Sequence, residues 1–222
     1  MSGPSSGAPE PTARDRRAAR YWDRQAASYD ERTAGVERRF LADSRRWVCE
    51  RAAGETLEVA VGTGANLSLY PAGVRLTALD RSPAMLDAAR RRADALGREA
   101  RLVSGDAGAL PFAAASFDAV VCTYALCGMP DERQALTEMV RVLRPHGRLL
   151  LADHVVATNP LVRGLERLLE LVTVPLQGEH YTRRPLTVVR AMGLAVVETD
   201  RLHAGAIERL HATAAPVSGG HR

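Results

Sequence analysis

The stretch Leu57-Glu-Val-Ala-Val-Gly62-Thr-Gly64-Ala-Asn-Leu67 decides the fold of this chain. A short run of apolar and β-branched residues leads directly into two glycines, which predicts a buried strand that ends in a tight turn. Glycine allows the backbone to adopt a positive φ and to approach a ligand closely. We expect a helix to follow the turn, so that its unpaired N–H groups face an anion such as a carboxylate or a phosphate.

An acidic residue, Asp80, follows the next predicted strand. At the carboxyl end of a parallel strand, an acid can accept hydrogen bonds from a ribose diol, which is also typical of nicotinamide-binding proteins. The dinucleotide fingerprint GxGxxG requires a third glycine, and Leu67 occupies that position here. A P-loop is excluded because no Gly-Lys-Ser/Thr follows the glycines. These features favour a cofactor with a ribose and a small anionic end but no pyrophosphate, such as S-adenosylmethionine.

Short apolar runs alternate with longer helical patterns along the rest of the chain. Strands are predicted near residues 57–61, 75–79, 101–103, 118–122, 148–154, 194–202 and 206–213, with helices over 82–96 and 132–143. This order is typical of a parallel sheet with helices on both faces. Only His203-Ala204-Gly205 separates the last two strands, and so short a connection requires an antiparallel hairpin. The predicted fold is a doubly wound, mostly parallel seven-stranded α/β sheet with an antiparallel C-terminal hairpin.

The length of 222 residues suits one domain, which we place at residues 15–215. Residues 1–14 are rich in Ser, Gly, Pro and Ala and predict a disordered tail, and residues 216–222 a flexible one. Helical segments are expected before the sheet, over residues 15–50. An insert over 155–190 contains a helix whose Leu161, Leu165, Leu168, Leu169 and Val172 share one face. We expect that face to cover core or substrate; contact with a membrane surface is the alternative.

The composition limits the possible partners. All 30 basic residues are arginines, which excludes a lysine general base, and the net charge is +4. The arginines are interspersed with acids and aromatic residues make up only 5%, so solvated helix faces are favoured over a nucleic-acid surface. Three cysteines without a CxxC spacing predict neither a disulfide framework nor a metal site. Without a secretory signal or an apolar run of about 20 residues, we predict a cytoplasmic protein with no membrane span.

The segment Glu58-Val-Ala-Val-Gly-Thr-Gly resembles motif I of the class I S-adenosylmethionine-dependent methyltransferases. The later motifs of that family follow in order: Asp80-Arg-Ser-Pro-Ala-Met85, Gly105-Asp106-Ala107, Leu110-Pro-Phe, Ser116-Phe-Asp118-Ala-Val-Val and Arg141-Val-Leu-Arg-Pro-His-Gly-Arg-Leu-Leu. The resemblance runs from about Tyr21 to Thr213. The chain departs from the pattern at Ala60, where many relatives have glycine, and at His146, where Pro-Gly-Gly is usual. The resemblance implies a methyltransferase that binds S-adenosylmethionine.

The same resemblance assigns roles to single residues. It implies that Gly62, Thr63 and Gly64 face the methionine moiety and that Asp80 binds the ribose hydroxyls. Asp106 would accept from the adenine amine, with Ala107 beside the ring. Thr123 would lie near the sulfonium, and Tyr29 would belong to an N-terminal lid over the cofactor. The remaining residues of the predicted cofactor site are Glu58, Ala60, Asn66, Arg81 and Met85.

The methyl acceptor is less constrained, because the cofactor supplies the electrophile. Gly64-Ala-Asn-Leu-Ser-Leu-Tyr-Pro, Val121-Cys-Thr-Tyr-Ala-Leu-Cys127 and Asp153-His154-Val155 resemble the alkyl-thiol methyltransferases, which implies S-methylation of a small thiol in specialised metabolism. His154 is the first candidate to take the thiol proton, and His180 and Tyr181 are the second. The alternatives are N-methylation of a phospholipid or small amine, C-methylation of a quinone, and a binding protein that only senses the cofactor. The only partner that we expect for this protein is a small-molecule methyl acceptor, and the expected oligomeric state is a monomer or a homodimer.

Overall fold

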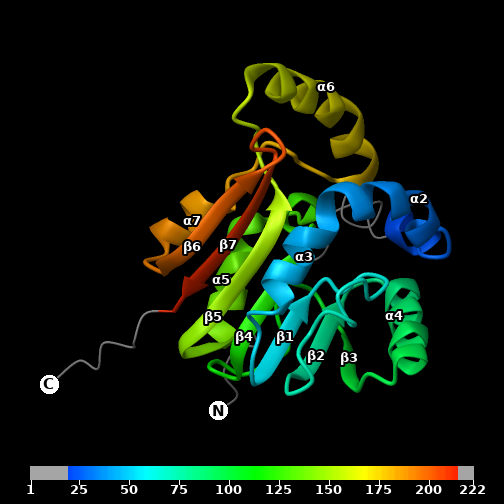
Figure 1. Ribbon diagram of the computed structural model, residues 1–222, viewed down its shortest axis with the longest axis vertical. Coiled ribbons are helices and arrows are strands. Elements are labelled where there is room, and N and C mark those ends of the chain that lie inside the picture. Colours follow the sequence, from blue (N-terminus) through cyan, green and yellow to red (C-terminus); the bar gives the residue numbers. More distant parts are fainter. Residues whose placement is uncertain (1–19, 215–222) are drawn as a thin grey trace, which may run out of the picture.

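Seven strands within residues 20–214, the part of the chain that the computed structural model describes, form one sheet in the order β3-β2-β1-β4-β5-β7-β6 (Figure 1). The pairs β1–β2, β1–β4, β2–β3 and β4–β5 are parallel, whereas β7 is antiparallel to both β5 and β6. The predicted fold is confirmed. The strands are β1 Glu55–Val59, β2 Arg75–Asp80, β3 Ala100–Ser104, β4 Phe117–Thr123, β5 Leu143–His154, β6 Ala195–Leu202 and β7 Ile207–Thr213.

Both faces of the central strands are buried, as a parallel sheet between helices requires. Along β4, Val120 and Cys122 pack with α5 and α7, whereas Ala119 and Val121 pack with α3 on the opposite face. The helices are α2 Tyr29–Val36, α3 Ala42–Cys49, α4 Pro83–Leu96, α5 Glu132–Val142, α6 Pro160–Gln177 and α7 Pro185–Ala191, with a π-helical stretch η1 Glu37–Leu41 and a 3-10 turn η2 Leu126–Gly128. Residues 20–25 are also helical.

The helix expected after the glycine turn is absent from the structure. Residues 62–69 instead form consecutive turns, with hydrogen bonds from Gly64 N–H to the Val61 carbonyl and from Leu67 N–H to the Gly64 carbonyl. Gly62 and Gly64 have φ of 56° and 84°, which a right-handed helix cannot contain. The expectation of a helix N-terminus facing an anion is therefore wrong at this place.

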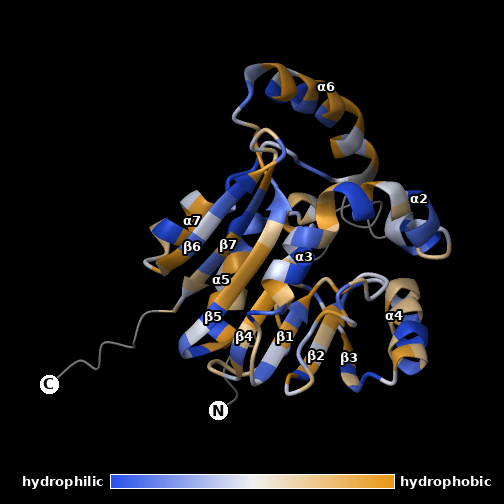
Figure 2. Ribbon diagram, viewed as in Figure 1, coloured by the Kyte–Doolittle hydropathy of each residue, from blue (hydrophilic) through white to orange (hydrophobic). Residues whose placement is uncertain are grey.

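The insert helix α6 is present, but its orientation differs from the expected one. Its leucine-rich face points outward, so that Leu161, Leu165, Leu168, Leu169 and Val172 are exposed. The expectation that this face covers the core is wrong, and its role over a substrate stays a prediction. Figure 2 shows hydrophobic and hydrophilic residues on opposite sides of α6, above the end of the sheet.

The tails predicted at 1–14 and 216–222 lie outside the described residues. Within 20–214, no helix combines the length and the apolar character needed to span a bilayer. In the same part of the chain, no group of three or more His, Cys, Asp or Glu side chains could hold a metal ion. All three cysteines are buried and unpaired, and burial raises the pKa of the Cys122 thiol well above its usual range.

Candidate active site

A pocket opens where the carboxyl ends of β1, β2 and β4 meet, the edge at which doubly wound sheets bind ligands. The segment before α2 and the loop after α6 complete its wall through Trp22, Tyr29 and Glu179. Most residues of the predicted cofactor site line this pocket: Tyr29, Ala60, Gly62, Thr63, Asp80, Arg81, Met85, Asp106, Ala107 and Thr123. Glu58, Gly64 and Asn66 do not line it.

Asp80 holds the glycine turn in place. Its Oδ2 accepts a hydrogen bond from Gly62 N–H at 2.8 Å, and its Oδ1 accepts one from Ser82 N–H at 2.9 Å. Burial raises the pKa of the Asp80 carboxyl, and these backbone donors partly offset that effect. The acid predicted to bind a ribose diol therefore also fixes the shape of the turn that the ligand meets.

The two glycines of the turn, Gly62 and Gly64, have different structural roles. A Cβ on Gly62 would meet open space, so this residue offers its bare backbone to the pocket. A Cβ on Gly64 would lie 2.6 Å from Leu67 Cδ1 and 3.3 Å from Ala89 Cα in α4. The absence of a side chain at Gly64 therefore permits close packing against α4, and its role beside the methionine moiety stays a prediction.

The opposite end of the pocket has the polarity that an adenine ring requires. Asp106 Oδ1 accepts a hydrogen bond from Gly108 N–H at 2.8 Å, and its Oδ2 lies 4.0 Å from Arg81 Nη2. The Asp106 side chain stays largely exposed, so it can accept a further donor. Ala107 and Met85 supply apolar surface beside it. From the bare glycine turn to this acid, the lining fits S-adenosylmethionine end to end.

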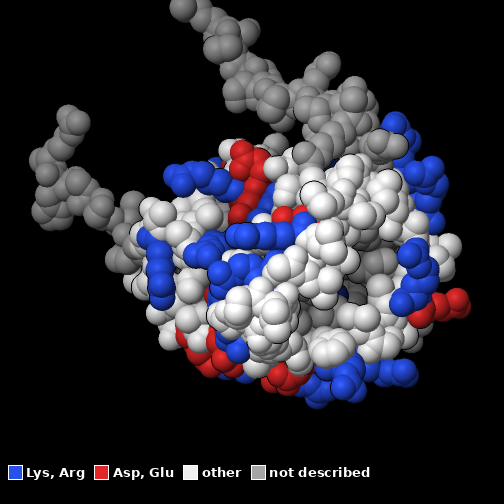
Figure 3. All heavy atoms as spheres, turned by 90° about the horizontal axis from the view of Figure 1, so that it is seen from above, with Lys and Arg blue, Asp and Glu red and all other residues white. Residues whose placement is uncertain are grey.

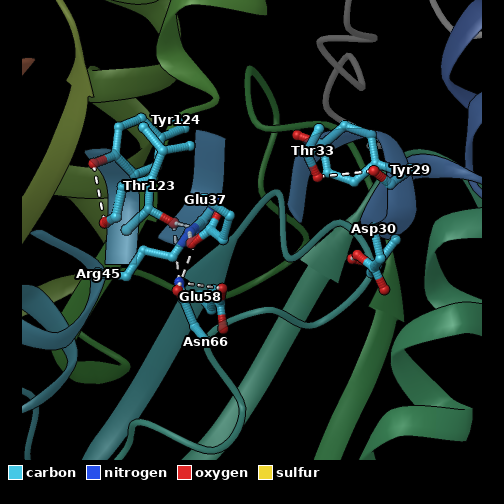
Figure 4. Close-up of polar contacts among 11 residues, drawn as sticks. Tyr29, Asp30, Thr33, Glu37, Arg45, Glu58, Asn66, Thr123 and Tyr124 are labelled. Atoms are coloured by element: carbon cyan, nitrogen blue, oxygen red, sulfur yellow. Dashed lines mark hydrogen bonds and ion pairs between the residues drawn. The ribbon is translucent and has the colours of Figure 1, made fainter. Parts of the chain in front are cut away.

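Beneath the pocket lies a buried polar network that centres on Arg45 of α3 (Figure 4). Arg45 Nη1 donates to Thr123 Oγ1 at 2.6 Å and to Asn66 Oδ1 at 3.2 Å, while its Nε donates to Glu37 Oε1 at 2.8 Å. Asn66 Nδ2 donates in turn to Glu58 Oε1 at 2.8 Å. Glu58 and Asn66 thus support the pocket floor from below, and only Arg45 and Thr123 reach the pocket itself.

The network places a permanent positive charge in the pocket wall. Burial raises the pKa of Glu58 to about 7, and the hydrogen bond from Asn66 opposes that rise. Arg45 stays charged because arginine does not lose its proton in proteins. Its guanidinium also lies 4.8 Å from the centre of the Tyr124 ring. Arg45 was not among the predicted site residues, because nothing in the sequence around it distinguishes it from the other arginines.

The N-terminal segment is held over the pocket by two acids. Asp30 accepts a hydrogen bond from the Thr63 hydroxyl at 2.7 Å and pairs with Arg92, and Asp23 accepts from the Ser82 hydroxyl. Tyr29 lies between these contacts and lines the pocket, in the position predicted for a lid residue. Burial raises its pKa to about 12, so its hydroxyl is neutral at physiological pH.

The three predicted catalytic residues lie behind the pocket wall. The His154 ring packs between the rings of Tyr124 at 5.2 Å and Tyr181 at 5.5 Å, and burial lowers its pKa to about 4. The His180 N–H donates to the Cys127 carbonyl at 2.8 Å. None of His154, His180 and Tyr181 lines the pocket. Their predicted direct role in taking the acceptor proton is therefore not supported by their placement.

Two wall residues connect this cluster to the pocket, and neither was predicted. Glu179 lines the pocket and accepts a hydrogen bond from the Tyr181 hydroxyl at 2.7 Å. Burial raises the pKa of Glu179. Tyr124, directly after β4, has φ of 53°, and strained backbone of this kind in a bulky residue is typical of functional sites. No local sequence signal distinguishes Glu179, because it lies in an irregular loop.

The fold and the site define a class of enzymes that bind a nucleotide cofactor: they combine a doubly wound sheet, a glycine turn and two acids near strand ends. Comparison with known proteins identifies the family. Residues 57–151 match the family described as "Methyltransferase domain". The chain is 34% identical over 156 residues to the ubiquinone/menaquinone biosynthesis C-methyltransferase UbiE of Roseobacter denitrificans, which covers 68% of this chain and 62% of that relative. It is 40% identical over 123 residues to the demethylmenaquinone methyltransferase of Thermus thermophilus, covering 54% and 56% of the two chains.

A longer match is to the demethylmenaquinone methyltransferase of Clavibacter sepedonicus, with 30% identity over 210 residues and 84% and 85% coverage. The chain thus spans less than two thirds of the first two relatives but most of this one. This chain belongs to the class I S-adenosylmethionine-dependent methyltransferases. The names of these relatives give no support to the alkyl-thiol group.

Solved structures agree on the fold. A possible histamine N-methyltransferase of Thermotoga maritima superposes with a TM-score of 0.67 at 21% identity, covering 89% of this chain and 99% of that one. The [4+2]-cyclase SpnF superposes with a TM-score of 0.64 at 17% identity, covering 79% and 80%. Because these named reactions differ, the fold alone does not determine the acceptor.

Ala60 offers a direct test of the pocket wall. Its φ of 60° costs a non-glycine residue about 1 kcal/mol, and its methyl group lies in the wall. We expect Ala60→Gly to bind S-adenosylmethionine several-fold more tightly, as measured by calorimetry, with little change in stability because glycine gains about 0.4–1 kcal/mol of entropy in the unfolded chain. Ala115→Gly is the control, since Ala115 has φ of 54° away from the pocket. Weaker binding by Ala60→Gly alone would contradict the expectation.

Proposed function

We propose that this enzyme methylates a ring carbon of a small quinol, which it holds as an anion. The observation that carries the proposal is the buried Arg45 guanidinium in the pocket wall, beside Thr123. A fixed cation in a site of low polarity stabilises negative charge on a bound acceptor. Among anionic acceptors, the relatives named demethylmenaquinone methyltransferases favour the quinol.

The same charge argues against an amine acceptor. An amine becomes positively charged when it is methylated, and a buried guanidinium beside it would oppose that charge. A thiolate is an anion and would suit Arg45 as well as a quinolate does. Thiol S-methylation is therefore the second candidate, supported by Arg45 but not by the relatives' names.

The groups on the wall suit proton removal from a hydroxyl. S-adenosylmethionine supplies a methyl group on a positively charged sulfur. Glu179, with its raised pKa, takes the hydroxyl proton of the quinol, and Arg45 faces the resulting oxyanion. The negative charge spreads onto the ring carbon, which would form its bond to the methyl group as the bond between that methyl group and the sulfur breaks and S-adenosylhomocysteine leaves. The hydrogen of the methylated carbon then passes to water as a proton, and the proton on Glu179 returns to the oxygen, so that one proton is released in each turnover.

The test is a panel of water-soluble quinols, thiols and amines, assayed for release of S-adenosylhomocysteine. We expect turnover of a reduced quinol, no turnover of the oxidised quinone, and a product that keeps both hydroxyls and gains a methyl group on a ring carbon. Turnover of thiols but not quinols would replace the proposal by its second candidate. Turnover of amines alone would refute the role given to Arg45.

A further inference from the structure

Helix α6 is attached to the protein by its polar side. Glu166 accepts a hydrogen bond from Ala157 N–H at 2.9 Å, and Glu170 accepts from Thr182 N–H at 2.8 Å and from its hydroxyl at 2.9 Å. The Thr173 hydroxyl donates to the Glu179 carbonyl at 3.1 Å, which joins the helix to the pocket wall. The two glutamates of the helix are therefore turned inward.

The opposite side of α6 presents a continuous row of leucines to solvent. Leu161, Leu168 and Leu171 are 84%, 62% and 71% exposed, and their neighbours on this side are also exposed: Leu165, Leu169, Val172 and Leu176. Single exposed leucines are ordinary, but a contiguous apolar face of this kind marks an interaction site. A helix that exposes its leucines and buries its glutamates is unfavourable in water alone, which points to an occupant for this face.

A further exposed apolar side chain is linked to α6 through the β6–β7 hairpin. The exposed Phe40 of η1 packs against the His203 ring at 5.0 Å, at the tip of that hairpin. The next residue of that tip, Ala204, accepts hydrogen bonds through its carbonyl from Thr158, just before α6. We call the outer face of α6, together with Phe40, the leucine face.

The charges beside the leucine face are positive. Arg38 and Arg39 flank Phe40 and are exposed, as is Arg167 on α6. None of these three arginines forms an ion pair within residues 20–214. The nearby acids are engaged elsewhere, because Glu37 pairs with Arg45, while Glu166 and Glu170 point inward. Figure 3, which looks onto this end of the molecule, shows arginines beside an uncharged area.

We propose that the leucine face docks the enzyme on an anionic lipid surface. The leucines would enter the boundary between headgroups and acyl chains, as amphipathic helices do, and the three arginines would meet acidic headgroups. Two copies of this chain placed face to face would instead bring these arginines together, which disfavours a dimer through the same surface. The proposal concerns binding alone and does not depend on the identity of the acceptor.

The test is flotation of the full chain with vesicles of phosphatidylcholine, with and without phosphatidylglycerol, at low and high salt. We expect flotation with the anionic vesicles, weakened by salt. The variant Leu168→Gln with Leu171→Gln should lower the partition coefficient about tenfold or more, since two leucines lose their burial. The matched control is Leu96→Gln with Val197→Gln, which changes residues that are 48% and 58% exposed elsewhere.

Three results would overturn the proposal. The first is no flotation of the unchanged chain, and the second is equal flotation of the Leu168/Leu171 variant. The third is a dimer in light scattering that the variant converts to a monomer, without vesicle binding in either. Because these leucines have no role in the core, the variant should keep its unfolding temperature and its affinity for S-adenosylmethionine. Measuring the unfolding temperature and the affinity for S-adenosylmethionine therefore distinguishes the loss of a docking surface from the loss of the fold.

Discussion

Replacing Arg45 by methionine is expected to lower both the stability of the protein and its turnover of an anionic acceptor. The change leaves Glu37 and the Asn66 side-chain oxygen without their shared donor, whereas Thr123 keeps its hydrogen bond from Asn66. Buried groups without partners cost about 1–3 kcal/mol each, and Glu37 keeps some contact with water, so we expect a loss of about 2–3 kcal/mol in urea unfolding. Loss of the charge that faces the acceptor should lower kcat by about a hundredfold.

Two further variants separate charge from structure. Arg45→Lys keeps the positive charge but not the forked donor, so it should recover part of kcat while remaining less stable than the unchanged protein. Arg46→Met is the matched control, because Arg46 is the exposed neighbour in α3. If Arg45→Met loses stability but keeps kcat for the preferred acceptor, Arg45 is structural alone. The preference for an anionic acceptor would then lose its basis.

Replacing Glu179 by glutamine is expected to lower kcat by about 10²- to 10³-fold while S-adenosylmethionine binds as before. A base works only when deprotonated, so the kcat/KM of the unchanged enzyme should fall as the pH drops through the pKa of Glu179. Because burial raises that pKa, the fall lies above the usual carboxylate range, and the glutamine variant should lack it. The measurement is a pH–rate profile with a soluble quinol.

His154 provides the comparison for this experiment. Its pKa of about 4 means that it is neutral and able to accept a proton across the whole working range. If His154 were the base, the acid limb would lie near pH 4 and would persist in the Glu179→Gln enzyme. His154→Gln should change the packing of Tyr124 and Tyr181 and lower kcat only modestly. A complete loss with His154→Gln and none with Glu179→Gln would reverse the two assignments.

The parts of this fold that are specified by a local pattern of residues could be predicted from the sequence. The strand before Gly62, the acid at the end of β2 and the short hairpin turn each depend on neighbours in the chain, and the structure contains all three. The helix after the turn could not be excluded in this way. Its absence follows from the positive φ of Gly62 and Gly64, which glycine permits but does not require.

The features that could not be predicted from the sequence depend on contacts between distant segments of the chain. Arg45 matters because α3 brings it to Thr123 at the end of β4, and Glu179 matters because α6 returns its loop to the same edge. Periodicity likewise identified the leucines of α6 but not the direction they face. That direction is set by hydrogen bonds to residues 157 and 182, which no pattern within the helix reveals.

The hydrogen bonds of Asp23 and Asp30 have a consequence for the timing of the reaction. Trp22 and Tyr29 form part of the pocket wall, so a movement of their segment away from Ser82 and Thr63 would open the pocket on that side. Such openings take microseconds to milliseconds in enzymes and often limit the steady-state rate. Two carboxylates that never touch the transferred methyl group are thus placed to act as the latch that governs how often the enzyme completes a cycle.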